Sequence, residues 1–119
     1  TMSLSGAQID ALLEQQWRPK GQSPVLLPSR GFRYRWDPSK PVGERVDASS
    51  ISLNGAPLDP AKSYRVNVNG FLANGGDGFT VLTEGRQRQA FGLDHEALIE
   101  YLGRFGPVSV PGEVRIERR

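Results

Sequence analysis

The sequence predicts an α+β fold in which a mixed or antiparallel sheet is covered by two helices. Two segments with helical spacing of apolar residues, near the start and in the last third of the chain, enclose several short segments that alternate like strands. Asn-Gly and Asp-Pro turn signals separate those strands at short intervals, which favours antiparallel neighbours. The length of 119 residues, without an interdomain linker, predicts one domain over residues 1–119.

The first helix is predicted over residues 6–17. Ser5 and Gln8 have the spacing of a capping box, in which each side chain satisfies a backbone N–H at the helix start. Residues 1–4 before it are predicted as the end of a strand, and residues 18–21 (RPKG) are predicted to end the helix. Apolar residues at helical intervals form its buried face: Ile9, Leu12, Leu13 and Trp17.

Four strand segments are predicted next. Residues 25–27 (VLL) read as a short buried strand, and residues 31–37 alternate aromatic residues with arginines, which predicts one buried aromatic face. Residues 45–53 continue the sheet. The pair Asn54-Gly55 predicts a two-residue type I′ hairpin, because that turn needs positive φ at both central positions. A further strand is predicted over residues 63–69.

The rest of the chain predicts a strand at residues 79–83, a second helix and a short final strand at residues 114–116. Asp94 is predicted to cap this helix, which ends near Gly103 or Gly106. Three apolar residues are expected on its inner side: Leu98, Ile99 and Leu102.

The composition of the chain excludes several kinds of functional site and partner. The chain has no cysteine, which excludes disulfides, thiolate metal sites and a cysteine nucleophile. A net charge of +2 predicts no nucleic-acid partner, and no run approaches the roughly 18 apolar residues of a membrane span. The single histidine, His95, is expected at the surface. We therefore expect no catalytic residue and no metal site in this chain.

The most distinctive segment is residues 71–79, which read FLANGGDGF. A phosphate-binding P-loop needs a lysine and a hydroxyl after its glycines, and Phe79 follows Gly78 instead. A calcium loop needs more oxygen ligands than Asn74 and Asp77. Two interpretations remain: a glycine-rich bulged hairpin whose Asp77 accepts backbone N–H bonds, or a nucleoside pocket. In the pocket, an aromatic ring would stack on a base and a carboxylate would accept bonds from vicinal ribose hydroxyls.

Residues 64–79, which read YRVNVNGFLANGGDGF, resemble the hallmark of the C-terminal domain of the 5′-nucleotidase and UDP-sugar hydrolase family. The likeness extends to residues 4–9, 31–37, 43–46 and 54–59, and it covers residues 3 to about 82. In that family this domain supplies substrate specificity. A separate N-terminal domain holds two divalent metals of the Zn or Mn type and the attacking water. The resemblance implies a truncated domain that lacks its N-terminal part and is inactive alone.

The resemblance also assigns roles to residues of the loop. Phe71 would be the second stacking aromatic and Asp77 the ribose acceptor, with Asn74 and Gly76 as secondary candidates. The first phenylalanine and the arginines of the family's pocket precede the strand that ends at Leu4, so this chain would supply half a pocket for a nucleoside or nucleotide. Gly70 is a departure, because family members often carry Asn or Asp there.

The family resemblance implies a periplasmic or extracellular protein, although the first residues do not have the pattern of a signal peptide. A second hypothesis stays open beside the nucleoside pocket. The chain would then be a non-catalytic structural or self-associating module that binds no nucleotide of its own. Apolar surface and an open strand edge exposed by truncation would favour such association.

Overall fold

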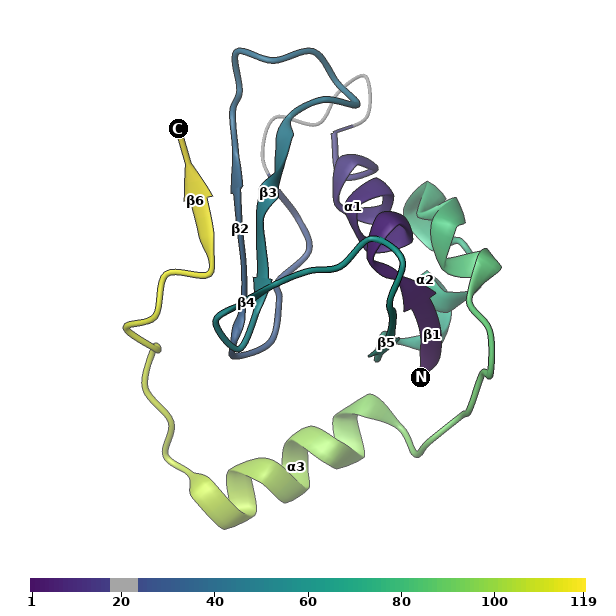
Figure 1. The fold of residues 1–119 in the computed structure, drawn as a ribbon. Helices are drawn as coiled ribbons and strands as arrows, with labels where there is room; N and C mark the ends of the chain where they lie inside the picture. Colours follow the sequence, from purple (N-terminus) through teal and green to yellow (C-terminus); the bar gives the residue numbers. More distant parts are fainter. Residues whose placement is uncertain (18–23) are drawn as a thin grey trace.

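The computed structural model describes residues 1–17 and 24–119, and its α+β fold confirms the predicted class (Figure 1). One sheet pairs β1 (Met2–Ser5) with β5 (Ser63–Val66) in antiparallel fashion. The other has the order β4-β3-β2-β6 and is mixed, because β2 runs antiparallel to β3 and parallel to β6. The strands of this mixed sheet are β2 (Phe32–Trp36), β3 (Val46–Leu53), β4 (Ala56–Pro57) and β6 (Ile116–Arg118).

Helix α1 (Gly6–Glu14) follows β1 directly. The predicted capping box is confirmed: Gln8 N donates to Ser5 Oγ at 3.1 Å, and Ser5 N donates to Gln8 Oε1 at 2.9 Å. The helix ends earlier than predicted, and Trp17 follows it after a turn. The predicted helix end at residues 18–21 lies outside the described residues. No helix in the described part of the chain is long and apolar enough to cross a membrane.

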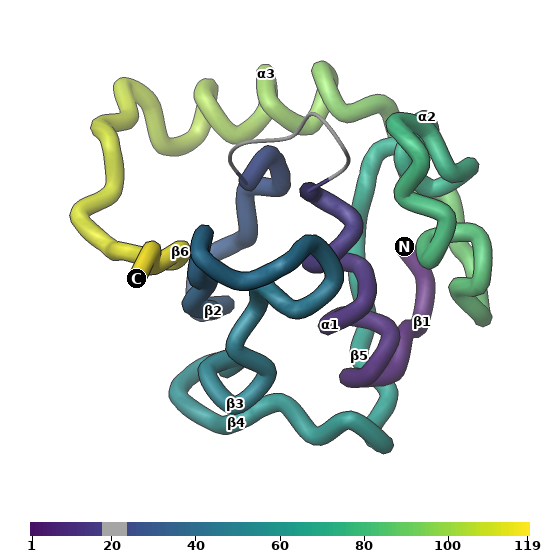
Figure 2. The backbone as a smooth tube through the Cα atoms, turned by 90° about the horizontal axis from the view of Figure 1, so that it is seen from above, coloured from purple at the N-terminus to yellow at the C-terminus, as the bar shows by residue number. Residues whose placement is uncertain are grey.

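The core consists of two apolar clusters on either side of α1, which lies between the two sheets (Figures 1 and 2). In the second cluster the indole rings of Trp17 and Trp36 stack with centroids 5.0 Å apart. Tyr34 and Trp36 are buried while Arg33 is exposed, which confirms the alternation predicted for β2. The first cluster contains Met2, Leu4, Ile9, Leu12, Phe79, Val81 and Leu82, and the second Leu13, Trp17, Tyr34, Trp36, Val46 and Ile51.

The turn between β3 and β4 is also as predicted. Asn54 has φ 51° and Gly55 has φ 82°, the positive values that a type I′ turn requires at both positions. The Asn54-Gly55 pair was sufficient to predict this turn.

Two predicted strands are wrong, and the final strand, predicted at residues 114–116, lies at Ile116–Arg118 instead. Residues 25–27 form no strand, and Val25 and Leu27 are exposed; prolines on both sides of this run oppose strand pairing. The predicted strand at 79–83 is the 3₁₀ helix η2 (Thr80–Glu84), whose Val81 and Leu82 enter the first cluster. Periodicity in a short apolar run cannot distinguish a buried strand from a helical turn.

Helix α3 (Asp94–Phe105) confirms the second predicted helix, but its predicted N-cap and its predicted buried face are wrong. Asp94 is not the N-cap; it lies in the first turn, where its Oδ1 accepts a hydrogen bond from His95 N at 2.8 Å. The residues expected to face inward, Leu98, Ile99 and Leu102, remain 44–67% exposed. Figures 1 and 2 show α3 standing away from both sheets.

Candidate functional site

The segment that carries the candidate residues is built from helical turns, so the bulged hairpin, one of the two interpretations of its sequence, is wrong. Strand β5 ends at Val66, and the short helix α2 (Gly70–Ala73) follows. Asn69 caps it: Leu72 N donates to Asn69 Oδ1 at 2.9 Å, and Ala73 N donates to the Asn69 carbonyl at 3.0 Å. An asparagine at an N-cap is a strong helix-start signal, so this residue could have indicated α2 from sequence.

Phe71 lies in α2 with 63% of its surface exposed, and Gly76 lies directly against it. A Cβ at Gly76 would stand 2.6 Å from Phe71 Cε1 and 2.5 Å from the Phe71 carbonyl oxygen. No side chain fits in that space. Gly76 therefore admits the ring of Phe71 and holds the following turn beside it.

Asp77 lies in the 3₁₀ turn η1 (Gly76–Gly78) with φ 53° and ψ 17°. A non-glycine residue in this left-handed region is uncommon, and such strain recurs at functional sites. Within residues 1–17 and 24–119 its exposed carboxylate forms no hydrogen bond or ion pair. The interpretation in which Asp77 serves the backbone of its own loop therefore fails among the described residues.

A groove of about 1130 Å³ runs between α2 and the start of α3. Phe71 and Asn74 line it, whereas Gly76 and Asp77 are not among the described residues of its wall. Arg88 also lines it and donates a hydrogen bond to the carbonyl of Ala73, the last residue of α2. Other lining residues that the sequence did not single out are Asn67, Asn69, Gln89 and Phe91.

The second described pocket is smaller, at about 210 Å³, and lies away from this loop. Charged side chains dominate its wall, and Ser39 and Ser49 donate hydrogen bonds that lower the pKa values of Asp37 and Asp47 below their ordinary value. These aspartates cap their own local turns. The larger groove is therefore the better candidate for a ligand of nucleoside size.

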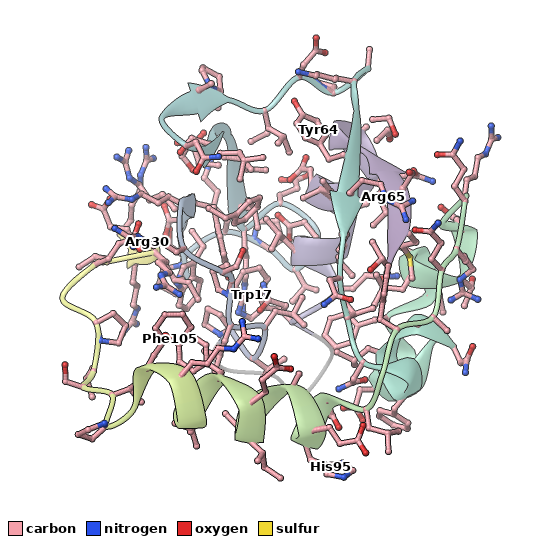
Figure 3. The ribbon with its side chains drawn as sticks, turned by 90° about the horizontal axis from the view of Figure 1, so that it is seen from below. Trp17, Arg30, Tyr64, Arg65, His95 and Phe105 are labelled. Atoms are coloured by element: carbon pink, nitrogen blue, oxygen red, sulfur yellow. The ribbon has the colours of Figure 1, made fainter. Side chains whose placement is uncertain are left out.

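A metal centre does not fit the described residues. Among residues 1–17 and 24–119, no three side chains of the His, Cys, Asp or Glu type come together at a possible ion site. His95 is a surface residue, as predicted, and Figure 3 shows its side chain directed away from the rest of the chain.

Comparison with known proteins adds the family context. A sequence model described as the 5′-nucleotidase C-terminal domain matches residues 1–84. The chain is 33% identical over 122 residues to a 5′-nucleotidase-related protein of Glossina morsitans morsitans, covering 95% of this chain and 22% of the relative. It is 27% identical over 123 residues to a snake venom 5′-nucleotidase of Gloydius brevicauda, covering 97% of this chain and 21% of that protein.

Among solved structures, the crystal structure of a 5′-nucleotidase precursor from Thermus thermophilus is similar, with a TM-score of 0.78 and 37% sequence identity. The similarity covers 98% of this chain and 24% of the Thermus chain. This chain thus spans only 21–24% of the three proteins compared.

Proposed function

Because this chain belongs to the family of 5′-nucleotidase C-terminal domains, we propose that it is the substrate-recognition part of a longer 5′-nucleotidase-type phosphomonoester hydrolase. Relatives that this chain matches over nearly its whole length are themselves about four to five times longer, which supports placing it within a larger enzyme. Its own part in that enzyme is to bind the nucleoside end of the substrate.

Phe71 stacks on the base and Asp77 accepts hydrogen bonds from the ribose hydroxyls. One observation carries this proposal: a capped helix and Gly76 hold the exposed ring of Phe71, and Asp77, the residue after Gly76, presents from a strained backbone a carboxylate that has no partner among the described residues. Stacking on an aromatic ring contributes about 1–3 kcal/mol per base. Ionised carboxylates only accept hydrogen bonds, which suits two neighbouring hydroxyl donors.

The two secondary candidates take different roles. Asn74 lines the groove beside Phe71, and its amide can both donate to and accept from a base edge. Gly76 acts through the space that it leaves for the ring of Phe71.

The bond-breaking chemistry belongs to another part of the longer enzyme. Hydrolysis at a two-metal site needs clustered ligands that hold the ions about 3.5–4 Å apart. The described residues gather no such cluster, so no step of the reaction is assigned to them. Two divalent ions of the Zn or Mn type and the attacking water would belong to the N-terminal domain, and this chain alone is inactive.

The proposed location is periplasmic or extracellular. A relative of similar sequence occurs in snake venom, a secreted fluid, which supports this assignment.

The second candidate function is a structural or self-associating module without nucleotide binding. It is favoured by one observation, the exposed apolar residues of α3. Titration of the chain with adenosine or AMP, followed by backbone amide NMR, separates the two. The proposal expects saturable shifts confined to residues 69–78. Unchanged spectra at millimolar ligand would leave the structural module as the better account.

A further inference from the structure

The backbone of Asp77 lies in a left-handed conformation that a non-glycine residue rarely adopts. Its φ is 53°, and two glycines of the same turn also have positive values, Gly75 at 83° and Gly78 at 68°. A residue other than glycine stays in this region only where the surrounding structure imposes the conformation. The contacts that hold this turn therefore decide whether the carboxylate of Asp77 is presented to a ligand.

The turn that carries Asp77 rests on the 3₁₀ helix that follows it, η2. A Cβ added at Gly75 would stand 3.1 Å from the methyl carbon Cγ2 of Thr83, so the start of the turn lies directly against η2. The hydroxyl of Thr83 donates to the carbonyl of Thr80 at 2.6 Å, which holds the Thr83 side chain in place. Phe79, which joins the turn to η2, is buried in the first cluster. A displacement of η2 would therefore move the turn.

Helix α1 holds the start of η2 through the side chain of Gln15. Gln15 Nε2 donates to Thr80 Oγ1 at 2.7 Å, and Gln15 Oε1 accepts from Val81 N at 3.1 Å. Both ends of the amide thus bind consecutive residues, which fixes the position and the direction of η2. Gln15 is itself held at the end of α1, where its N–H donates to the carbonyl of Ala11 at 3.2 Å. Helix α1 and η2 also pack against each other in the first cluster.

We propose that Gln15 is a positioning residue for ribose recognition. It acts through η2, by keeping the backbone of Asp77 in the conformation that presents the carboxylate. The inference rests on the proposed contact of Asp77 with the ribose hydroxyls. When the binding-competent conformation is only partly populated, the apparent affinity falls by that fraction. Loss of the Gln15 amide should therefore weaken the contribution of the hydroxyls, while stacking on Phe71, which lies in the separately capped α2, is kept.

Gln15→Ala tests the proposal, with Gln8→Ala as the matched control. Gln8 lies on the same helix and contacts the far end of η2, where its Nε2 donates to Glu84 Oε2 at 3.2 Å. Its removal also breaks the capping box, so the control lowers stability without releasing the start of η2. Each protein is titrated with adenosine and 2′,3′-dideoxyadenosine. The preference for adenosine should fall roughly 2- to 10-fold in Gln15→Ala, the effect of about one net hydrogen bond, and stay at the parent value in Gln8→Ala.

NMR of the free protein separates positioning from a general loss of stability. The Cα and Cβ chemical shifts of Asp77 report its left-handed backbone, and they should change in Gln15→Ala but not in Gln8→Ala. Gln15→Glu keeps an acceptor for Val81 N, and its other oxygen can accept from the Thr80 hydroxyl, so it should restore both the shifts and the preference. Thr80→Val breaks the same contact from the other side. Added to Gln15→Ala, it should cause no further loss of preference.

Three results would overturn the assignment of Gln15. One is unchanged Asp77 shifts in Gln15→Ala, and another is changed shifts with the parent's preference intact. The third is an equal loss of preference in Gln15→Ala and Gln8→Ala. A parent chain that binds the two ligands equally would instead refute the ribose contact of Asp77. The shifts of the free protein would still decide whether Gln15 positions the turn, so the two failures are distinguishable.

Discussion

The aromatic ring of Phe71 lies so close to Gly76 that a Cβ on Gly76 would stand 2.6 Å from the ring carbon Cε1. This contact ties the exposed aromatic residue to the turn that carries Asp77, the next residue in the chain. One glycine therefore determines how the two proposed recognition groups lie relative to each other.

Gly76→Ala should destabilise the chain and weaken adenosine binding. The new methyl group would meet both the ring and the carbonyl oxygen of Phe71, and the backbone atom has little freedom to move. Overpacking of this kind costs about 1–3 kcal/mol of unfolding free energy. Urea unfolding and calorimetric titration measure the two effects. Gly70→Ala is the matched control, because a Cβ there meets nothing within 4 Å; equal behaviour of the two variants would refute the packing explanation.

Asn69→Ala should weaken adenosine binding by loosening α2. The substitution removes the side-chain oxygen that accepts from Leu72 N, and loss of an N-cap costs about 1 kcal/mol. Asn69→Asp keeps an acceptor at the same position and should restore both stability and affinity. If Asn69→Asp binds adenosine as weakly as Asn69→Ala does, the Asn69 amide contacts the ligand directly, and loss of the helix cap does not explain the weaker binding.

Stability should respond to pH through Asp10 on α1. Burial raises the pKa of Asp10, and repulsion from Glu14 one turn later adds to it; one oxygen of each carboxylate is buried without a partner among the described residues. The folded state therefore binds the Asp10 proton more tightly than the unfolded state. The charged Asp10 carboxylate therefore lowers the free energy of unfolding at pH values above its pKa in the folded state. This loss of stability is removed as the pH falls toward the ordinary pKa of 3.8.

Asp10→Asn isolates that contribution. The variant should be more stable than the parent chain at neutral pH, and the difference should shrink as the solution is acidified. Urea unfolding of both proteins from neutral to acidic pH gives the difference in unfolding free energy directly. Other titrating groups, such as Asp47, whose pKa is lowered, contribute equally to both proteins and cancel in the difference. A difference that stays constant with pH would contradict the assignment to Asp10.

Trp36→Ala should unfold much of the chain's second apolar cluster. The Trp36 ring is buried and stacks on Trp17, and truncating a buried tryptophan costs about 3–5 kcal/mol. Phe91→Ala removes an aromatic ring that is 72% exposed, so its effect on unfolding free energy should stay within about 0.5 kcal/mol. Thermal unfolding followed by circular dichroism compares the two.

The proposed function places the two metal ions in another part of the longer enzyme, so the isolated chain should not hydrolyse AMP, with or without added Mn²⁺ or Zn²⁺. Phosphate release at the rate of a protein-free control is the expected result. Sustained turnover by purified chain, removed by a chelator, would show that it contains catalytic chemistry of its own.

The parts of the fold that sequence predicted well are those determined by neighbours along the chain. The capping box at Ser5 and Gln8, the Asn54-Gly55 turn and the alternation of β2 depend on local hydrogen bonding or on a period of two. Each of these three features can be predicted from a few consecutive residues.

The parts that sequence missed depend on contacts distant in the chain. The apolar runs at 25–27 and 79–83 are too short for their periodicity to identify strands, and the apolar side of α3 has no described surface to cover it. At the site, the motif identified Phe71 and Asp77 as candidates. It did not reveal that α2 carries one and that a left-handed backbone carries the other.

The most direct test of the account compares the dissociation constants of adenosine and 2′,3′-dideoxyadenosine for the parent chain, Phe71→Ala and Asp77→Asn. The parent should prefer adenosine, and Asp77→Asn should lose most of that preference, because the amide is uncharged and keeps only one acceptor oxygen for the two ribose hydroxyls. Phe71→Ala should weaken both ligands alike, by roughly 5- to 150-fold, which corresponds to a stacking contribution of about 1–3 kcal/mol. An Asp77→Asn variant that keeps the parent's preference, or a Phe71→Ala variant that binds adenosine as tightly as the parent, would contradict the proposed recognition of a nucleoside.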